Sequence, residues 1–305
     1  MIDKFQVGDT VSAVVVVKSI AKQKTKKLED FIKLTINDGQ NDISAFIWDI
    51  QVCRYDDGDE VQQNDIVLLK GHVGEFNNNR KIDVIKISKT EKSINLPSIT
   101  KEEFENLKTR YSKLCKSITD EHFSSIIDSV NYNVFDDFIK APAAKSNHQA
   151  HIGGLFKHSI EVAELCSSIH NSSPENLNYS LLITGALLHD IGKIKEYTYD
   201  KSFDRSTPGK LVGHTTLGII IITKLLPDNV PPKKFAELVH LLLSHHGKKE
   251  WGAPIEPLMK EAVILHFSDM INSYCSRFDE LKQRQNSEWS DFDTAYSRQW
   301  YFKSI

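Results

Sequence analysis

The first ninety residues alternate between apolar and polar positions, with the two-residue period that is typical of half-buried β-strands. The clearest run, Phe31–Asn37, reads F-I-K-L-T-I-N and is followed by the turn-forming pair Asp38-Gly39. Similar runs, separated by turn residues, predict strands at 11–20, 31–37, 43–48, 66–73 and 81–87. Five short strands in so few residues predict a small closed barrel.

The pattern changes after residue 100, where apolar positions recur every three or four residues, as on one face of an α-helix. Thr100 and Glu103 have the spacing of a capping box, which predicts a helix start at this point. This helix is predicted over 101–117, and others at 120–130, 155–170, 178–190, 213–226, 233–245 and 257–283. No run in this part has a strand pattern, so we expect it to be all-α.

These two patterns predict a two-domain chain, with a small all-β barrel followed by an all-α domain. The barrel is expected over 1–92, and the OB-fold is the first choice, with an SH3-like barrel as the alternative. A linker and leading helix are expected over 93–120, the main helical domain over 121–283, and a tail over 284–305. The tail is rich in aromatic residues, which favours packing on the body of the protein or on another subunit of a homo-oligomer.

Composition and charge narrow the class of protein. The chain has 305 residues, of which 40% are hydrophobic and 26% charged, and its net charge is −3. Bulk charge therefore does not indicate a nucleic-acid partner, and any such site must be a local patch. The four cysteines are scattered without a C-x-x-C pair, which disfavours a disulfide framework or a thiolate zinc site.

The N-terminal sequence M-I-D-K-F-Q-V has no apolar stretch of the kind that a signal peptide needs. The apolar runs Val14–Val17 and 219–222 are far shorter than the roughly 20 residues that span a membrane. We therefore expect a cytoplasmic location and no membrane partner.

The strongest chemical signal is L-L-H-D-I-G-K at 187–193, with His189 and Asp190 at the end of an apolar helix. An unpaired buried carboxylate costs several kcal/mol. Coordination of a metal ion removes this cost, because imidazole and carboxylate are natural ligands for divalent transition metals. Gly192 would end the helix and let the backbone turn at the site.

Other histidines and an aspartate have positions that suit the same site. His158 and Asp269 lie on the apolar faces of predicted helices, His214 begins one, and His245-His246 ends one. A single histidine of this kind is usually a hydrogen-bonded core residue. The ordered set, in which every member lies at a helix end or on an inward face, instead indicates a metal centre.

This ordered set resembles the HD superfamily of metal-dependent phosphohydrolases. In that family a histidine, the His-Asp pair and a distal aspartate hold one metal ion, which implies His158, His189, Asp190 and Asp269 here. Members with further histidines hold a second ion, and the aspartate of the pair bridges the two. For this chain the resemblance implies Asp190, His214, His245 and His246 as the second set of ligands.

A second resemblance covers nearly the whole chain and is to the YhaM-type 3′-to-5′ exoribonucleases, which join an OB-like domain to an HD domain. It rests on A-P-A-A-K at 141–145, H-I-G-G-L-F-K-H-S at 151–159, L-V-G-H at 211–214, L-S-H-H-G-K-K-E-W-G-A-P at 243–254 and P-L-M-K-E-A-V-I-L-H-F-S-D at 257–269. The chain departs from the family at His148-Gln149, where a histidine pair is common, and at His151, where an aromatic residue is common.

The resemblance implies hydrolysis of single-stranded RNA from its 3′ end, with single-stranded DNA as an alternative substrate. Two divalent ions are expected; Mn is favoured by the resemblance, and Co, Fe, Ni or Zn also suit nitrogen and oxygen ligands. Asp190 would bridge the ions, and Lys193 would stabilise negative charge on the phosphate. The alternative for Lys193 is a solvated lysine at a helix end.

Substrate contacts are expected in both domains. In the helical part, Trp251 would stack on a terminal base, or alternatively pack its own loop, with Lys248, His148 and His151 nearby. In the barrel, Lys24, Lys26 and Lys27 fall between the first two strands, where an OB-fold contacts nucleic acid, and Trp48 is available for stacking. The alternative for these barrel residues is a solvated loop and a core aromatic.

Two other functions fit the same sequence. One is a phosphohydrolase acting on nucleotides or cyclic nucleotides, which would not need the barrel. The other is a non-catalytic binding module with a degenerate HD domain, which the filled set of ligand positions disfavours.

Overall fold

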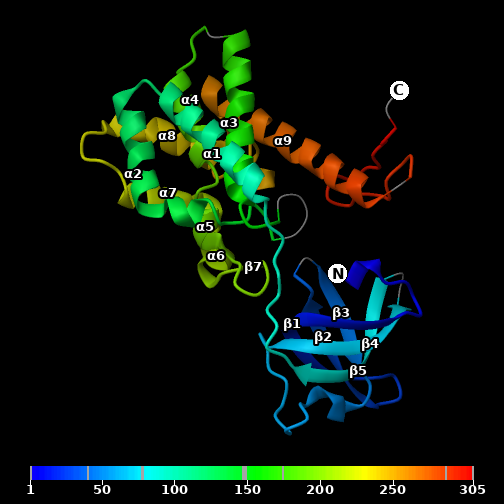
Figure 1. Cartoon of the computed structure of the whole chain (residues 1–305). Helices are drawn as coiled ribbons and strands as arrows, with labels where there is room; N and C mark the ends of the chain where they lie inside the picture. Colours follow the sequence, from blue (N-terminus) through cyan, green and yellow to red (C-terminus); the bar gives the residue numbers. More distant parts are fainter. Residues whose placement is uncertain are drawn as a thin grey trace. The chain divides into compact units, whose positions relative to one another are not determined.

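The computed structural model describes residues 2–39, 41–76, 79–145, 150–173, 175–285 and 287–303. The chain divides into two units, coloured along the sequence in Figure 1. One unit is Met1–Pro97 together with Thr198–Asp204, and the other is Ser98–Tyr197 together with Arg205–Ile305.

The described part of the first unit contains a closed five-stranded barrel. Its strands are β1 (Thr10–Lys24), β2 (Asp30–Asn37), β3 (Asp42–Ile47), β4 (Ile66–Phe76) and β5 (Asn79–Lys89), with short 3-10 turns η1 (Ile2–Lys4) and η2 (Ile50–Cys53). The order around the barrel is β1-β2-β3-β5-β4, in which the β3–β5 pair is parallel and the other pairs are antiparallel. This arrangement confirms the predicted OB-like barrel.

Alternation of side chains explains the barrel core. On β2 the side chains of Ile32, Leu34 and Ile36 are buried, while the residues between them are more exposed. Strand β1 is longer than predicted because its polar end, residues 21–24, still pairs with β2. Its first half pairs with β4, and the register with β2 shifts after Val17. A Cβ atom on Gly71 would lie 2.5 Å from the carbonyl oxygen of Asp83, so the β4–β5 pair requires glycine where its own register shifts.

The second unit is built from helices. They are α1 (Lys101–Ser117), α2 (Glu121–Phe138), α3 (Gly154–Ser172), α4 (Tyr179–Leu188), α5 (Lys193–Glu196), α6 (Thr207–Val212), α7 (His214–Lys224), α8 (Pro232–Ser244) and α9 (Lys260–Arg284), with the 3-10 turn η3 (Lys249–Trp251). The start of α1 is as predicted, because the Thr100 side chain accepts a hydrogen bond from the Glu103 backbone amide.

Two predictions for the helical part were wrong. We expected no strand after residue 100, but β6 (Tyr197–Thr198) pairs with β7 (Asp204–Arg205), and strands of two residues are too short to show alternation. Gly192 was expected to end a helix, but α4 ends at Leu188, and Gly192 is the N-cap of α5 with an ordinary right-handed backbone. Glycine is needed there for close packing, since a Cβ atom would lie 1.8 Å from the His214 carbonyl oxygen.

Helix α4 lies at the centre of the helical unit and packs against α2, α3, α8 and α9 (Figure 1). All ten of its residues are buried except Tyr179, which is the pattern of a core helix rather than an amphipathic surface helix. Because α4 ends inside the unit, the residues that follow it, His189 and Asp190, enter the interior.

The described part of the tail packs on α9. Phe302 is buried and its ring contacts that of Phe278, while Trp300 contacts both Phe278 and Tyr274. Among the described residues, no helix combines the length and apolar character that crossing a bilayer requires.

Candidate metal centre and nucleic-acid interface

The first group of candidate ligands surrounds one oxygen of Asp190. The Nε2 atom of His158, on α3, lies 3.5 Å from Asp190 Oδ2 and 3.2 Å from Nε2 of His189. His189 Nε2 lies 3.4 Å from the same Oδ2 atom, and Asp269 Oδ1, on α9, lies 3.1 Å from His158 Nε2. Three separate helices therefore deliver the four residues that we expected to hold one ion.

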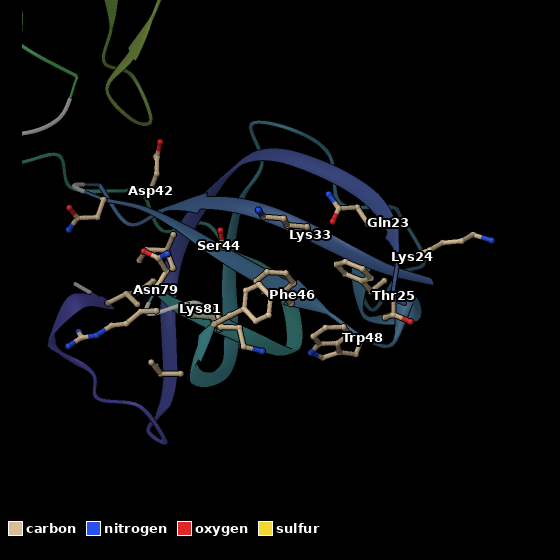
Figure 2. Close-up of a pocket in the computed structure, with 18 of the residues that line it drawn as sticks. Gln23, Lys24, Thr25, Lys33, Asp42, Ser44, Phe46, Trp48, Asn79 and Lys81 are labelled. Atoms are coloured by element: carbon tan, nitrogen blue, oxygen red, sulfur yellow. The ribbon is translucent and has the colours of Figure 1, made fainter. Parts of the chain in front are cut away.

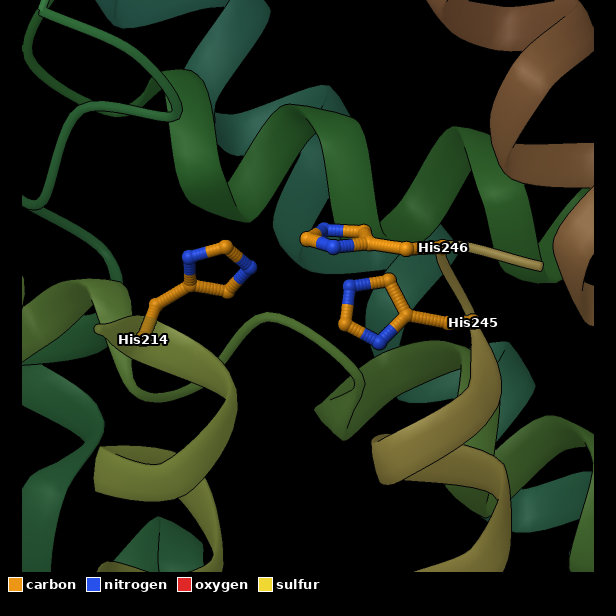
Figure 3. A group of neighbouring side chains, drawn as sticks. All are labelled: His214, His245 and His246. Carbon is orange, nitrogen blue, oxygen red and sulfur yellow. The ribbon is translucent and has the colours of Figure 1, made fainter. Parts of the chain in front are cut away.

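The second group surrounds the other oxygen of Asp190, and Figure 3 shows its three histidines, His214, His245 and His246. His214 is the first residue of α7, and its Nε2 lies 3.3 Å from Asp190 Oδ1. His245 and His246 directly follow α8, and His245 Nε2 lies 3.7 Å from the same oxygen. Ligand atoms of His214, His245 and His246 all lie within 4.8 Å of one another.

Several buried polar atoms of these groups have no hydrogen-bond partner within the described structure. They are Asp190 Oδ1, His214 Nε2, His245 Nε2 and His246 Nδ1. Leaving a buried polar atom unsatisfied costs about 1–3 kcal/mol each, and a cluster of four that face one another is rare in a folded protein. A divalent cation would satisfy all four together, so the donor set fits a metal ion.

A further set of contacts orients the imidazole rings. In each case Nδ1 faces a neighbouring oxygen, so that Nε2 is turned towards Asp190. The Nδ1 atoms pair as follows: His158 with Asn272 Oδ1 at 2.8 Å, His189 with Ala186 O at 2.8 Å, His245 with Leu242 O at 2.7 Å, and His214 with Glu196 Oε2 at 3.0 Å. Glu196 and Asn272 are positioning residues that the sequence analysis missed.

Electrostatics of the first group favour a bound cation. Burial disfavours the charged form of His158, but the carboxylates of Asp190 and Asp269 outweigh this and raise its pKa to about 10. Burial would raise the pKa of Asp190, yet the positive charge of Lys193 and the neighbouring His189 hold it well below the usual range. Burial would also raise the pKa of Asp269, but its contact with His158 lowers it, so both carboxylates are ionised at neutral pH and attract positive charge.

In the second group, by contrast, the pKa values of two histidines are lowered. Burial holds the pKa of His245 well below that of free imidazole, and burial also lowers the pKa of His246. Neutral imidazole is the form that binds a metal ion, so these two rings are ready to act as ligands at neutral pH.

Lys193 lies in the same cavity rather than in solvent. Its Nζ atom lies 2.5 Å from Asp190 Oδ2, and only 15% of its side chain is exposed. It lines a cavity with His158, Asp190, His246 and Asp269, and the attraction of Asp190 raises its pKa despite its burial. This location does not fit the alternative of a solvated lysine at a helix end.

The predicted substrate residues of the helical unit lie at different distances from this cavity. Trp251 is half exposed and, with His246 and Asp269, lines a hollow beside it. Lys248 Nζ lies 4.8 Å from the centre of the Trp251 ring. The Nδ1 atom of His151 lies 3.2 Å from the carbonyl oxygen of Ile152, and His151 does not line the cavity among its described residues. His148 lies outside the described residues.

The barrel carries a groove of about 960 Å³ on the face of β2 and β3 (Figure 2). Its floor is aromatic: the rings of Phe46 and Trp48 stack at 5.9 Å, and Phe31 lies 5.2 Å from Trp48. Lys81 Nζ lies 5.4 Å from the centres of both the Phe46 and Trp48 rings. Aromatic faces with flanking cations are the features with which single-strand binders hold bases and phosphates.

The predicted lysines contribute unequally to this groove. Lys24 and Lys26 line it, whereas Lys27 is not among its described lining residues. We expected Lys24 in a loop, but it lies at the end of β1, because that strand extends beyond its apolar part. Lys33 and Lys81 line the groove and were missed, since the approach of both to Phe46, and of Lys81 to Trp48, depends on the pairing of strands.

Comparison with known proteins agrees with this geometry. Residues 155–272 match the family model of the HD domain, and all the candidate ligands lie within that stretch. The 3′-5′ exoribonuclease YhaM of Listeria welshimeri is 28% identical over 94% of this chain and 93% of its own length. The protein of the same name from Bacillus subtilis is 28% identical over 92% of this chain and 90% of its own length.

Among solved structures, the mitochondrial single-stranded DNA-binding protein of S. cerevisiae matches 27% of this chain and 93% of its own, with 13% identity and a TM-score of 0.22. That similarity is too low to support the fold, so the barrel is assigned from the order of its own strands.

Proposed function

We propose that this chain, which is similar to the YhaM-type exoribonucleases over more than 90% of its length, is a divalent-metal-dependent 3′-to-5′ exonuclease of single-stranded RNA. Its products would be nucleoside 5′-monophosphates. Single-stranded DNA is a second candidate substrate, because aromatic side chains stack on the bases of either polymer.

The observation that carries this proposal is the position of the Asp190 carboxylate between two groups of imidazoles. We propose that His158, His189, Asp190 and Asp269 hold one ion, and that Asp190, His214, His245 and His246 hold a second. Mn is the favoured metal, on the basis of the family resemblance, and Co, Fe, Ni or Zn would suit the same donors. None of the described cysteines lines the cavity, which agrees with a centre of nitrogen and oxygen ligands.

Bound at this centre, divalent ions would lower the pKa of water from 15.7 towards about 7 and so supply a nucleophile at neutral pH. Asp190 would hold its carboxylate between the two groups of histidines, and Glu196 would keep His214 turned towards it. Lys193 would exchange its contact with Asp190 for the scissile phosphate, where its ammonium group would stabilise the charge that develops during hydrolysis.

The barrel groove would hold the single strand. Trp48 would stack on a base, and Lys24, Lys26 and Lys27 would attract phosphates, together with Lys33 and Lys81. We propose substrate contacts in the helical unit for Trp251, Lys248, His148 and His151, of which Trp251 is supported by its place beside the cavity. A nucleotide phosphohydrolase would have no use for such a groove, so the groove favours a polymer substrate.

We also propose a cytoplasmic location without a membrane partner, as expected of an enzyme of RNA turnover. A homo-oligomer is a further proposal, which the mass of the purified protein by light scattering would test: one chain mass would exclude it.

The function is tested with a single-stranded RNA that carries a label at its 5′ end, with and without Mn²⁺. The native protein should give a ladder that shortens from the 3′ end, and only with the metal. Asp190→Ala should leave the RNA intact, whereas Asp279→Ala, an exposed aspartate on the same helix as Asp269, should behave like the native protein. RNA that stays intact while the protein hydrolyses a small phosphodiester would refute a polymer substrate.

A further inference from the structure

A hollow of about 370 Å³ adjoins the cavity of the metal centre, and the two share His246, Asp269 and Ser273 in their walls. Ligand pockets in proteins span about 300–1,000 Å³, so the hollow has room for a single small ligand rather than for a length of polymer. Its position means that a molecule bound there would have one end at the metal centre.

The walls of the hollow are mainly aromatic and come from three separate segments. Trp251 is the last residue of η3, and its ring lies 5.9 Å from His266 of α9 at an angle of 32°. Tyr274, one turn beyond Asp269 on α9, contacts Tyr296 of the C-terminal segment, with ring centres 4.4 Å apart. Flat aromatic surfaces of this kind bind nucleobases by stacking, with little preference for sequence.

The C-terminal segment that provides Tyr296 is held firmly on α9 (Figure 1). Both carboxylate oxygens of Asp293 accept hydrogen bonds from Arg277, at 2.9 and 3.1 Å, and Asp293 is buried. Trp300 Nε1 donates to the same carboxylate at 3.1 Å, and the backbones of Asp293 and Arg298 pair with each other. A turn closed at its base in this way presents Tyr296 as part of the wall in a fixed position.

Charge in the hollow suits a nucleotide. Among the described residues that line it, Asp269 is the only acid, and it lies on the side shared with the metal centre. Lys248, whose ammonium lies 4.8 Å from the Trp251 ring and 3.6 Å from Glu250 Oε1, is beside the aromatic wall as part of a neutral ion pair. The aromatic side of the hollow therefore suits a neutral base, and the side at the metal centre suits its phosphate.

We propose that this hollow is the subsite for the 3′-terminal nucleoside of the strand, and that the C-terminal segment 293–302 forms its outer wall through Tyr296. This inference rests on the proposed exonuclease function. It adds the residues that would favour a strand whose 3′ end carries a base. The released nucleoside 5′-monophosphate would leave from the same subsite.

The first test measures equilibrium binding of adenosine 5′-monophosphate and of ribose 5-phosphate to the metal-loaded protein by calorimetry. The native protein should bind the nucleotide at least about tenfold more tightly, because only the nucleotide has a base to stack. Tyr296→Ala should lose this preference. Ala295→Trp should lose it too, by filling the hollow without removing a contact of the C-terminal segment. Tyr301→Ala should keep it, since Tyr301 contacts Trp289 outside the hollow.

The second test compares oligoribonucleotides that end in a normal or an abasic 3′ nucleotide. The native protein should show a KM about tenfold lower for the normal end, with similar kcat, and Tyr296→Ala should abolish the difference. Tyr301→Ala, which lies outside the hollow, should match the native protein on both oligonucleotides. The inference is overturned if the native protein binds both probes equally, or if Tyr296→Ala slows all substrates by one factor, which would indicate a merely structural role. RNA that stays intact would refute the polymer substrate. The subsite would still be supported if Tyr296→Ala and Ala295→Trp both lose the preference for the nucleotide.

Discussion

The barrel groove and the metal centre differ in how exposed their side chains are and in how many contacts each would use. The groove presents exposed aromatic rings and ammonium groups on a regular sheet, where Trp48 is 50% exposed and most neighbours come from adjacent strands. The metal centre gathers histidines and aspartates, buried or mostly buried, from α3, α7, α9 and the ends of α4 and α8. The first site would gain affinity from many weak contacts, and the second would depend on a few atoms placed to within tenths of an ångström.

This difference implies that the two sites should fail in different ways. A lost groove contact should weaken binding of the polymer and leave the chemistry intact, since each stacked base contributes only about 1–3 kcal/mol. A lost ligand in the buried centre should abolish the reaction on any substrate. Small and polymeric phosphodiesters, assayed side by side, therefore separate the contributions of the two sites.

The largest expected effect is that of Asp190→Ala. Because both groups of histidines face this carboxylate, its removal should lower kcat by about 10³-fold or more on RNA and on bis(para-nitrophenyl) phosphate alike. Metal content, measured by atomic emission on the same samples, should fall with activity. Full activity with the metal lost would mean that the catalytic site lies elsewhere.

Next in size is Glu196→Ala, which removes the carboxylate beside His214 Nδ1. Outer-shell partners of this kind contribute about 10–100-fold to metal affinity. The variant should need correspondingly more Mn²⁺ for half-maximal activity, whereas Glu196→Gln, which keeps an oxygen-bearing side chain of the same length beside His214, should lose less. Equal losses in the two variants would argue for a steric role instead.

Trp48→Ala tests the groove and should have a smaller and more selective effect. The KM for RNA should rise about tenfold through the loss of one stacked base, with kcat and the hydrolysis of the small diester unchanged. Trp289→Ala, which removes an equally exposed tryptophan from the tail, is the matched control. A loss of small-diester activity in Trp48→Ala would contradict the separation of the two sites.

The last test changes only the salt concentration. Raising NaCl from about 50 to about 200 mM should raise the KM for RNA steeply, because lysine–phosphate contacts release counterions. Replacing Lys33 and Lys81 with glutamine should reduce that slope, and the small diester should show almost no dependence in either protein. A steep salt dependence for the small diester would place the charge effect at the metal centre.

Sequence reasoning recovered the elements that are long enough to show a period. The five barrel strands and the seven longer helices were predicted, although their ends moved by several residues, as for α2, which runs to Phe138 instead of 130. The short elements α5, α6, β6 and β7 were missed, because two to six residues do not complete a recognisable pattern. Gly192 was noticed, but its reason, the close approach of His214, appears only in three dimensions.

The candidate metal ligands could be identified from the sequence because they occur in contiguous motifs. The residues that orient those ligands could not be identified in this way. Glu196 sits in the unremarkable sequence K-I-K-E, and Asn272 is one polar residue on a long helix. Each matters only through a histidine brought close by tertiary packing: Glu196 through His214 and Asn272 through His158. The same holds for Tyr296, whose aromatic tail gave no sign that it reaches the hollow beside Asp269.

The central claim is that Asp190 is shared between two metal ions. Anomalous diffraction at the manganese edge, from crystals of the native protein soaked in Mn²⁺, tests it most directly. The account predicts two peaks, one among His158, His189 and Asp269 and the other among His214, His245 and His246, each beside a different oxygen of Asp190. Crystals of active protein with no peak at Asp190, or with a peak at only one of its oxygens, would contradict it.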